Sequence, residues 1–221
     1  MDSQRPEDPR TRGTGALLRH ALSEMERSYE TGGRATVRDL LRPLGSRQTA
    51  LGAALLALPF LSPVSLGPIT TPVSLLIALL GVRLLRKRDD VPVPERLLRV
   101  QVPRSVHTLM VAMLHRVSRW ADRGRGARGS AWVRGKAGRR LCGAGVLAGA
   151  LLLAVPVPLL PLTNTLPAAA IILFVLGWTN QDLRLTRYGM GALAGAVLLF
   201  ASLGVAAGTV GWAAMRALLP G

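Results

Sequence analysis

The side chains best suited to bind a substrate in this sequence are hydroxyl and amide groups set inside two long apolar stretches. They are Thr70 and Thr71 in the first stretch and Thr163, Asn164 and Thr165 in the second. Both groups lie where prolines interrupt the stretch, so one helix must end there and another must begin. The free N–H groups at the start of a helix attract an anion, such as a sugar-phosphate oxygen. The sequence therefore predicts substrate binding at these breaks, with no metal and no cofactor.

The two interruptions correspond to one another, which indicates an internal repeat. Their prolines are Pro59, Pro63, Pro68 and Pro72 in the first, and Pro156, Pro158, Pro161 and Pro167 in the second. At membrane depth, an interrupted helix is tolerated only where protein or a water-filled cavity satisfies the freed backbone groups. Paired interruptions therefore point to a working site. A second interpretation stays open, in which the Thr and Asn side chains only cap the new helices.

Groups for acid–base or metal chemistry are few, and we expect that the protein is not an enzyme. The histidines are His20, His107 and His115. His107 and His115 lie eight residues apart on one expected helix without carboxylate neighbours, which favours solvated or interfacial imidazoles over a metal site. Asp182 is the only acid after Asp122, so the membrane part has no paired carboxylates. We expect Asp182 to lie at a helix end beside Arg184.

The charge of the chain is concentrated between the two apolar stretches. The net charge is +16 and the mean hydropathy is +0.33, with 18% charged residues. Residues 83–140 hold 16 basic and 4 acidic residues. A basic segment can indicate nucleic-acid binding, but this one borders apolar stretches and lacks a binding signature with interleaved aromatic residues. We therefore expect a cytoplasmic loop that rests on anionic lipids of the bilayer, and no nucleic-acid partner.

Segment lengths favour hairpins over simple membrane spans. A spanning helix needs about 20 apolar residues for a hydrocarbon core of about 30 Å, whereas Thr49–Leu61 and Val73–Leu85 offer roughly 20 Å each. Basic residues flank this first stretch on both sides, which places both of its ends in the cytoplasm. We therefore favour a re-entrant helical hairpin over one kinked helix, and the second stretch predicts a similar, deeper hairpin. No charged residue lies in the middle of an apolar segment, which argues against proton-coupled transport.

Shorter helices are expected outside the apolar stretches. Apolar residues at spacings of three and four predict amphipathic helices over residues 14–29 and 103–120. Thr36 and Asp39 resemble a capping box that opens a helix through Leu44.

The C-terminal segment Tyr188–Met215 is nearly uncharged and would be about 42 Å long as a helix. That length predicts either one tilted transmembrane helix or a pair. GxxxG patterns such as Gly191 to Gly195 allow close helix packing and leave a homo-oligomer open. Cys142 is expected to be a small buried residue of the second stretch.

These features predict an all-α, polytopic integral membrane protein with two pseudo-symmetric re-entrant hairpins and a C-terminal transmembrane helix or pair. The expected parts are a cytoplasmic N-terminal segment (1–45), the first hairpin (46–88), a basic cytoplasmic or interfacial linker (89–140), the second hairpin (141–182) and the C-terminal transmembrane segment (186–219).

The second stretch also carries a pattern typical of a known family. Its residues are Pro156, Pro158, Thr163–Pro167, Gly177 and Asp182. In this pattern the chain resembles the ExoD exopolysaccharide-synthesis family of bacterial membrane proteins, over roughly residues 36–205. The first half is similar, with Leu58-Pro59 and with Gly81 followed by basic residues. The resemblance implies a multi-pass protein of the inner membrane that is connected with exopolysaccharide production.

Three functional hypotheses follow from these predictions. The first is a non-enzymatic accessory or transport factor that handles a lipid-linked or anionic substrate beside the polysaccharide-synthesis machinery. The second is a small lipid or ion transporter that affects polysaccharide indirectly. The third is a membrane scaffold that docks partners through its Arg-rich linker.

Overall fold

The computed structural model describes residues 14–30, 35–62, 70–86, 95–123, 133, 135–155 and 163–218. Side chains are not described for residues 45–47, 96–97, 115, 118–123 and 210–218. Of the prolines expected at the two breaks, those outside the described residues are Pro63, Pro68, Pro156, Pro158 and Pro161.

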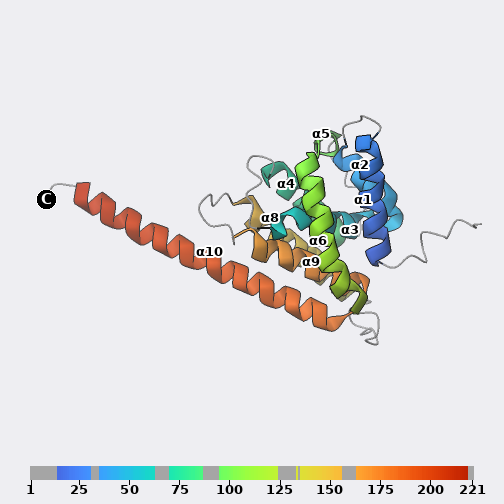
Figure 1. Ribbon diagram of the computed structural model, residues 1–221. Helices are drawn as coiled ribbons and strands as arrows, with labels where there is room; N and C mark the ends of the chain where they lie inside the picture. Colours follow the sequence, from blue (N-terminus) through green and yellow to red (C-terminus); the bar gives the residue numbers. More distant parts are fainter. Residues whose placement is uncertain are drawn as a thin grey trace, which may run out of the picture.

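The described chain is helical apart from short connections, so the all-α prediction is confirmed (Figure 1). In chain order the α-helices are α1 (Thr14–Glu30), α2 (Val37–Leu41), α3 (Gln48–Ala57), α4 (Thr70–Arg86), α5 (Glu95–Leu98), α6 (Arg104–Arg123), α8 (Lys136–Ala154), α9 (Thr165–Thr179) and α10 (Leu183–Leu218). The 3₁₀ helices η1 (Arg42–Arg47) and η2 (Leu58–Leu61) flank α3.

The first apolar stretch forms α3, η2 and α4. Pro59 lies in the first turn of η2, where the backbone N–H that proline lacks would have no partner within the helix. Because proline cannot donate the next α-helical hydrogen bond, α3 ends before this residue. Every residue from Ala50 to Ala57 is buried. α3 is therefore a core helix without a polar face, and α4 packs against it.

The second apolar stretch forms an antiparallel pair, α8 and α9. A Cβ on Gly145 of α8 would meet the ring of Phe174 in α9, and one on Gly149, a turn further, would meet Ile171. The α9 numbers fall as the α8 numbers rise, so the two helices run in opposite directions. The described parts of this stretch therefore form a helical hairpin.

The two stretches pack together through α4 and α8. A Cβ on Gly81 of α4 would lie 2.8 Å from the backbone N of Leu147, and one on Gly143 of α8 would lie 2.7 Å from the backbone N of Leu85. Glycine is required at this crossing because any side chain would force two backbones apart. The same pairs make α4 and α8 antiparallel. Since α8 is also antiparallel to α9, the starts of α4 and α9 lie at one end of the bundle, which we call the tip end.

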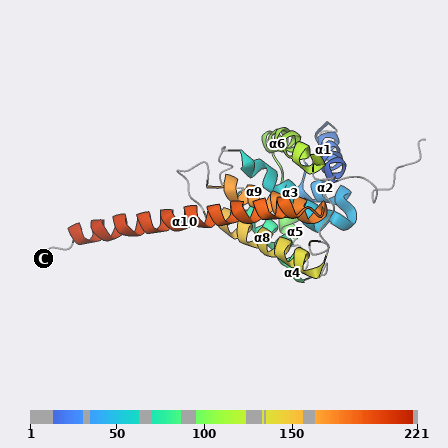
Figure 2. The same cartoon turned by 90° about the horizontal axis from the view of Figure 1, so that it is seen from below.

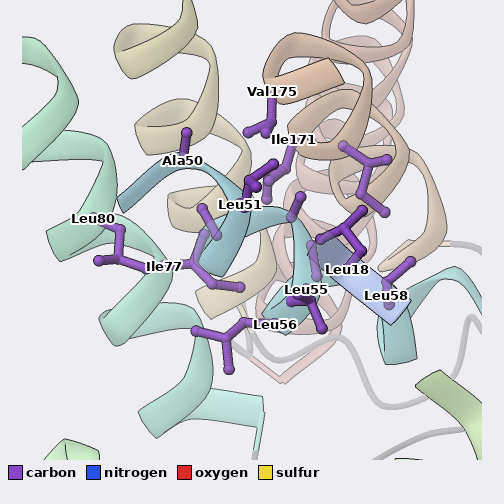
Figure 3. Close-up of a cluster of buried hydrophobic side chains, with 14 of the residues drawn as sticks. Leu18, Ala50, Leu51, Leu55, Leu56, Leu58, Ile77, Leu80, Ile171 and Val175 are labelled. Carbon is purple, nitrogen blue, oxygen red and sulfur yellow. The ribbon is translucent and has the colours of Figure 1, made fainter. Parts of the chain in front are cut away.

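α3 lies at the centre of the molecule, enclosed by both stretches and by the N-terminal helix. Leu51 has Ile77 of α4 on one side and Ile171 of α9 on another, while Leu18 of α1 lies nearby (Figure 3). α3 also contacts η1 and η2, the segments that flank it. The first apolar stretch thus has its leading helix covered by protein on all sides.

The C-terminal segment forms one continuous helix of 36 residues, α10, rather than a pair. Its first part packs antiparallel on α9, with Gly177 against Thr186 and Gly189 against Phe174. Its second part extends away from the bundle in both views (Figures 1 and 2). Apart from neighbouring atoms of α10 itself, no described atom lies within 4 Å of a Cβ built on any of four glycines of this helix: Gly191, Gly195, Gly204 and Gly208.

The expected capping box is present at the start of α2. The carboxylate of Asp39 accepts hydrogen bonds from the backbone N and from Oγ1 of Thr36, at 2.9 and 2.7 Å. The α-helix ends at Leu41 and continues as η1 rather than reaching Leu44. Pro43 explains the change, because it cannot donate the hydrogen bond of a further α-helical turn.

The N-terminal helices form a cap with α6. Backbone hydrogen bonds from Val37 N to Val100 O (3.1 Å) and from Val102 N to Ala35 O (3.0 Å) join the segments that precede α2 and α6. α1 packs on α6, and α6 packs on η2. The cap therefore covers the end of the first arm of the first stretch.

Candidate functional site

The predicted substrate-binding residues lie at the starts of α4 and α9. Thr70 and Thr71 are the first two residues of α4, whereas Thr163 and Asn164 directly precede α9, which begins at Thr165. Both groups therefore lie at the tip end. In the described part of the chain, α4 packs on α3 and α8, while α9 packs on α3, α8 and α10. The structure brings the two groups to one end of the bundle, on helices that are not packed together.

The polar side chains at the start of α9 do not all act as caps. Asn164 occupies the N-cap position, but its side chain makes no capping hydrogen bond. Thr165 Oγ1 is buried and has no hydrogen-bond partner among the described residues. At the start of α4, the carbonyl oxygen of Thr71 accepts a hydrogen bond from Ser74 Oγ at 2.9 Å. Amide and hydroxyl groups donate and accept hydrogen bonds without titrating near neutral pH, so the tip end suits binding rather than proton transfer.

The two ends of the bundle expose different side chains. Large exposed apolar side chains lie at and beyond the tip end, on α4 (Leu75), α8 (Leu151 and Val155) and α10 (Val197, Leu198 and Val205), and two more, Tyr188 and Met190, lie on α10 nearer its start. The opposite end, which we call the basic end, carries Arg83, Arg86, Lys136, Arg139, Arg140, Arg184 and Arg187. The basic side chains of α4, α8 and α10 thus gather at one end, as the positive-inside rule describes for membrane proteins, while Gln101 of the N-terminal cap lies beside Val73 near the start of α4.

Two described helices are long and apolar enough to cross a bilayer, α8 and the part of α10 from Leu183 to Thr209. In α8, 44% of the apolar window is buried within the protein, as in a core helix, whereas in α10 only 6% is buried. A long apolar surface without protein cover favours contact with lipid over contact with water. The molecule's association with a membrane is therefore indicated chiefly by α10.

A groove between α6 and α9 was not predicted from the sequence. It is lined by Leu61, Arg116, Val117, Ala169, Ile172, Leu173 and Leu176, and we call it the α6–α9 groove. Its volume is about 350 Å³, at the lower end of the range of small-molecule sites. Arg116 is exposed, and the other lining residues are apolar. The four α9 residues follow a helical spacing and share one face of the helix. Because α9 is apolar on all faces, its sequence does not distinguish the face that lines the groove.

A polar cleft of about 440 Å³ lies between α1 and the α2–η1 segment, lined by His20, Glu24, Ser28, Asp39, Arg42 and Pro43. The Asp39 carboxylate is already engaged by Thr36 in the capping box. Among the described residues, no group of three or more His, Cys, Asp or Glu side chains is placed to hold a metal ion. The cleft therefore lacks a ligand set for a metal.

His107 is buried, so the prediction of a solvated or interfacial imidazole was wrong for this residue. Its Nε2 lies 3.2 Å from the carbonyl oxygen of Leu22 in α1, to which it donates in the tautomer that carries a proton on Nε2. The ring of Tyr29 lies edge-on at 5.4 Å, and the Arg104 guanidinium lies over Tyr29. Burial raises the pKa of Tyr29, while Arg104 acts in the opposite direction. The error arose because the sequence pattern of α6 cannot show that α1 covers this position.

Asp182 lies at a helix end and Cys142 is buried, as expected. Asp182 Oδ1 accepts a hydrogen bond from the backbone N of Arg184 at 2.8 Å, at the turn between α9 and α10. Its own N–H donates to the carbonyl oxygen of Gly177 at 2.8 Å, and Gln181 in the same turn has a φ of 59°. Cys142 is buried in α8.

Sequence comparison places these features in a known family. The family described as "Exopolysaccharide synthesis, ExoD" matches residues 18–202 of this chain. The chain belongs to the ExoD family. It is similar to Protein ExoD of Rhizobium meliloti (strain 1021), with 32% identity over 184 residues that cover 81% of this chain and 75% of that protein. No solved structure shows significant similarity to the chain.

The ExoD match confirms the resemblance seen in the second apolar stretch. Its range includes both apolar stretches, every residue of the α6–α9 groove and the part of α10 that packs on α9. The far end of α10 lies beyond the matched range. The tip end and the groove are thus features of the ExoD part of the chain.

Proposed function

We propose that this ExoD-family protein is a multi-pass inner-membrane protein that supports exopolysaccharide synthesis as a non-enzymatic accessory or transport factor. Its substrate is lipid-linked or anionic and is bound at the tip end. Its partners are anionic lipids of the bilayer and the polysaccharide-synthesis machinery. The observation that carries this proposal is the contrast between the apolar tip end, where neutral binding groups collect, and the basic end.

The contrast between the ends supports an orientation in the membrane. The basic end faces the cytoplasm, because basic residues remain on that side of bacterial inner membranes. α9 has 15 residues and is about 22 Å long, which is shorter than a hydrocarbon core of about 30 Å. A short helix of this kind suits a re-entrant hairpin whose tip ends inside the membrane. α10 continues past the tip end and crosses to the other side.

The composition of the two stretches supports binding without catalysis. Residues 48–86 contain no His, Cys, Asp or Glu, and residues 141–182 contain only Cys142 and, at the far end from the tip, Asp182 among these types. General acid–base and nucleophilic catalysis depend mostly on such groups. The Asn164 amide and the Thr165 hydroxyl offer hydrogen bonds that can hold a sugar hydroxyl or a phosphate oxygen.

Replacing Asn164 by Ala tests the proposed substrate site. Because its side chain makes no capping bond, Asn164→Ala should leave the amount of protein in membranes unchanged. Loss of one neutral hydrogen bond should lower activity by about two- to tenfold. The measurement is exopolysaccharide output in a strain whose chromosomal copy is replaced by the variant, normalised to the membrane level of the protein.

The control is Ser23→Ala, which removes an exposed hydroxyl from α1, a helix that packs on α2, α3, α6 and η1. It should give full output. Wild-type output from Asn164→Ala at an unchanged membrane level would remove the tip end from the proposed function.

A further inference from the structure

We propose that the α6–α9 groove binds one hydrocarbon chain of an anionic phospholipid, with the lipid phosphate on Arg116. The inference rests on the membrane location in the proposed function. It uses different residues, since none of the tip-end Thr and Asn side chains is among those that line the groove. It therefore adds a regulatory or anchoring lipid to the substrate site rather than describing the same site again.

The shape and lining of the groove suit a hydrocarbon chain. Apolar walls come from three elements, with Leu61 on η2, Val117 on α6 and the four α9 residues opposite. Ala169 is the smallest of the described lining side chains and lies three residues before Ile172 on α9. A cavity of about 350 Å³ is large enough for a small ligand. Among the described lining side chains, Arg116 alone carries hydrogen-bonding groups.

The charge at the rim decides which lipid is preferred. A chain that leaves the bilayer for the groove exchanges one apolar environment for another, so the chain alone gives little selectivity. Arg116 supplies the selectivity, because a guanidinium forms paired, charge-assisted hydrogen bonds with a phosphate. None of the described lining residues is acidic, and residues 83–140 hold 16 basic against 4 acidic residues. This surrounding charge favours an anionic head group over a zwitterionic one, whose ammonium group it repels.

The test uses the full-length protein, purified in detergent and mixed with equal amounts of phosphatidylglycerol and phosphatidylcholine with identical chains. Native mass spectrometry counts the lipids that remain bound. The wild-type protein should retain about five times more phosphatidylglycerol than phosphatidylcholine. This ratio corresponds to about 1 kcal/mol from the single basic residue Arg116. Arg116→Gln should lose one tightly held phosphatidylglycerol, because its charge and its paired donors are gone.

Two matched controls separate the groove from the rest of the surface. Arg86→Gln removes an exposed arginine at the basic end and should leave the tightly held lipid in place. Ala169→Phe fills the groove and should displace that lipid, whereas Leu151→Phe on the exposed face of α8 should not. Because Arg116 is exposed, Arg116→Gln is expected to fold. This variant therefore tests lipid binding in the groove even if Ala169→Phe does not fold.

Equal lipid retention by wild-type protein and Arg116→Gln would overturn the inference, as would full retention by Ala169→Phe. Neither result touches the proposed function, which is tested by polysaccharide output from Asn164→Ala. Conversely, wild-type output from Asn164→Ala alongside the expected lipid loss in Arg116→Gln would overturn the proposed function alone.

Discussion

The two apolar stretches are both interrupted by prolines but have different surroundings. In the first, α3 is buried along its length and has α1, α4 and α9 around it. In the second, α8 exposes Leu151 and Val155, and one face of α9 lines the α6–α9 groove. The leading helix of the first stretch is therefore part of the core, whereas α4, with Leu75 exposed, presents a surface as α8 does.

The difference arises from the segments that accompany each stretch. The first is preceded by amphipathic α1, whose buried residues Leu18, Leu22 and Met25 close over the core. The second stretch is followed by α10. Only the first part of α10 packs on α9, and the rest of α10 extends away from the bundle. α3 is thus enclosed by its neighbours, whereas α10 covers only part of the second stretch.

The largest expected effect is the loss of stability when the enclosed stretch is truncated. Leu55 of α3 is fully buried, whereas Leu151 of α8 is 58% exposed. Leu55→Ala leaves a cavity and should lower the free energy of unfolding by about 2–5 kcal/mol. Leu151→Ala should change it by less than about 0.5 kcal/mol. Denaturant unfolding of the purified proteins in detergent measures both, and equal losses would remove the distinction between the stretches.

A smaller effect should separate the crossing of α4 and α8 from the free part of α10. Gly143→Val places a side chain against the backbone of Leu85 and should cost about 1–3 kcal/mol. Gly195→Val enters open space and should be nearly neutral, because valine is no worse in a helix than glycine. Thermal unfolding in detergent compares the two. A large loss of thermal stability in Gly195→Val would indicate that α10 packs on a second copy of the protein. Without that result, the homo-oligomer stays a prediction.

Local features of this fold could be predicted from the sequence. The spacing of apolar residues predicted α1 and α6, and Thr36 and Asp39 predicted the capping box. These features depend on residues a few positions apart, whose interactions are the same wherever the segment lies. The family could also be predicted, because the Thr163–Pro167 pattern is local.

Features that depend on distant segments could not be predicted. α3 is apolar on every face, and such a helix is equally suited to a protein core and to a membrane. The burial of His107 requires Leu22, which lies 85 residues away in the chain. The groove likewise needs Arg116 of α6 beside Leu173 of α9, and no periodicity in either helix specifies that they meet.

Cysteine accessibility tests the central claim, the opposite placement of the two ends in the membrane. Cys142 is the only cysteine and is buried, so Cys142→Ala provides a background for Leu151→Cys at the tip end and Arg184→Cys at the basic end. A membrane-impermeant maleimide should label position 184 in inside-out vesicles alone and position 151 in neither vesicle orientation. Labelling of position 151 as readily as position 184, or of position 184 from the outside, would contradict the account.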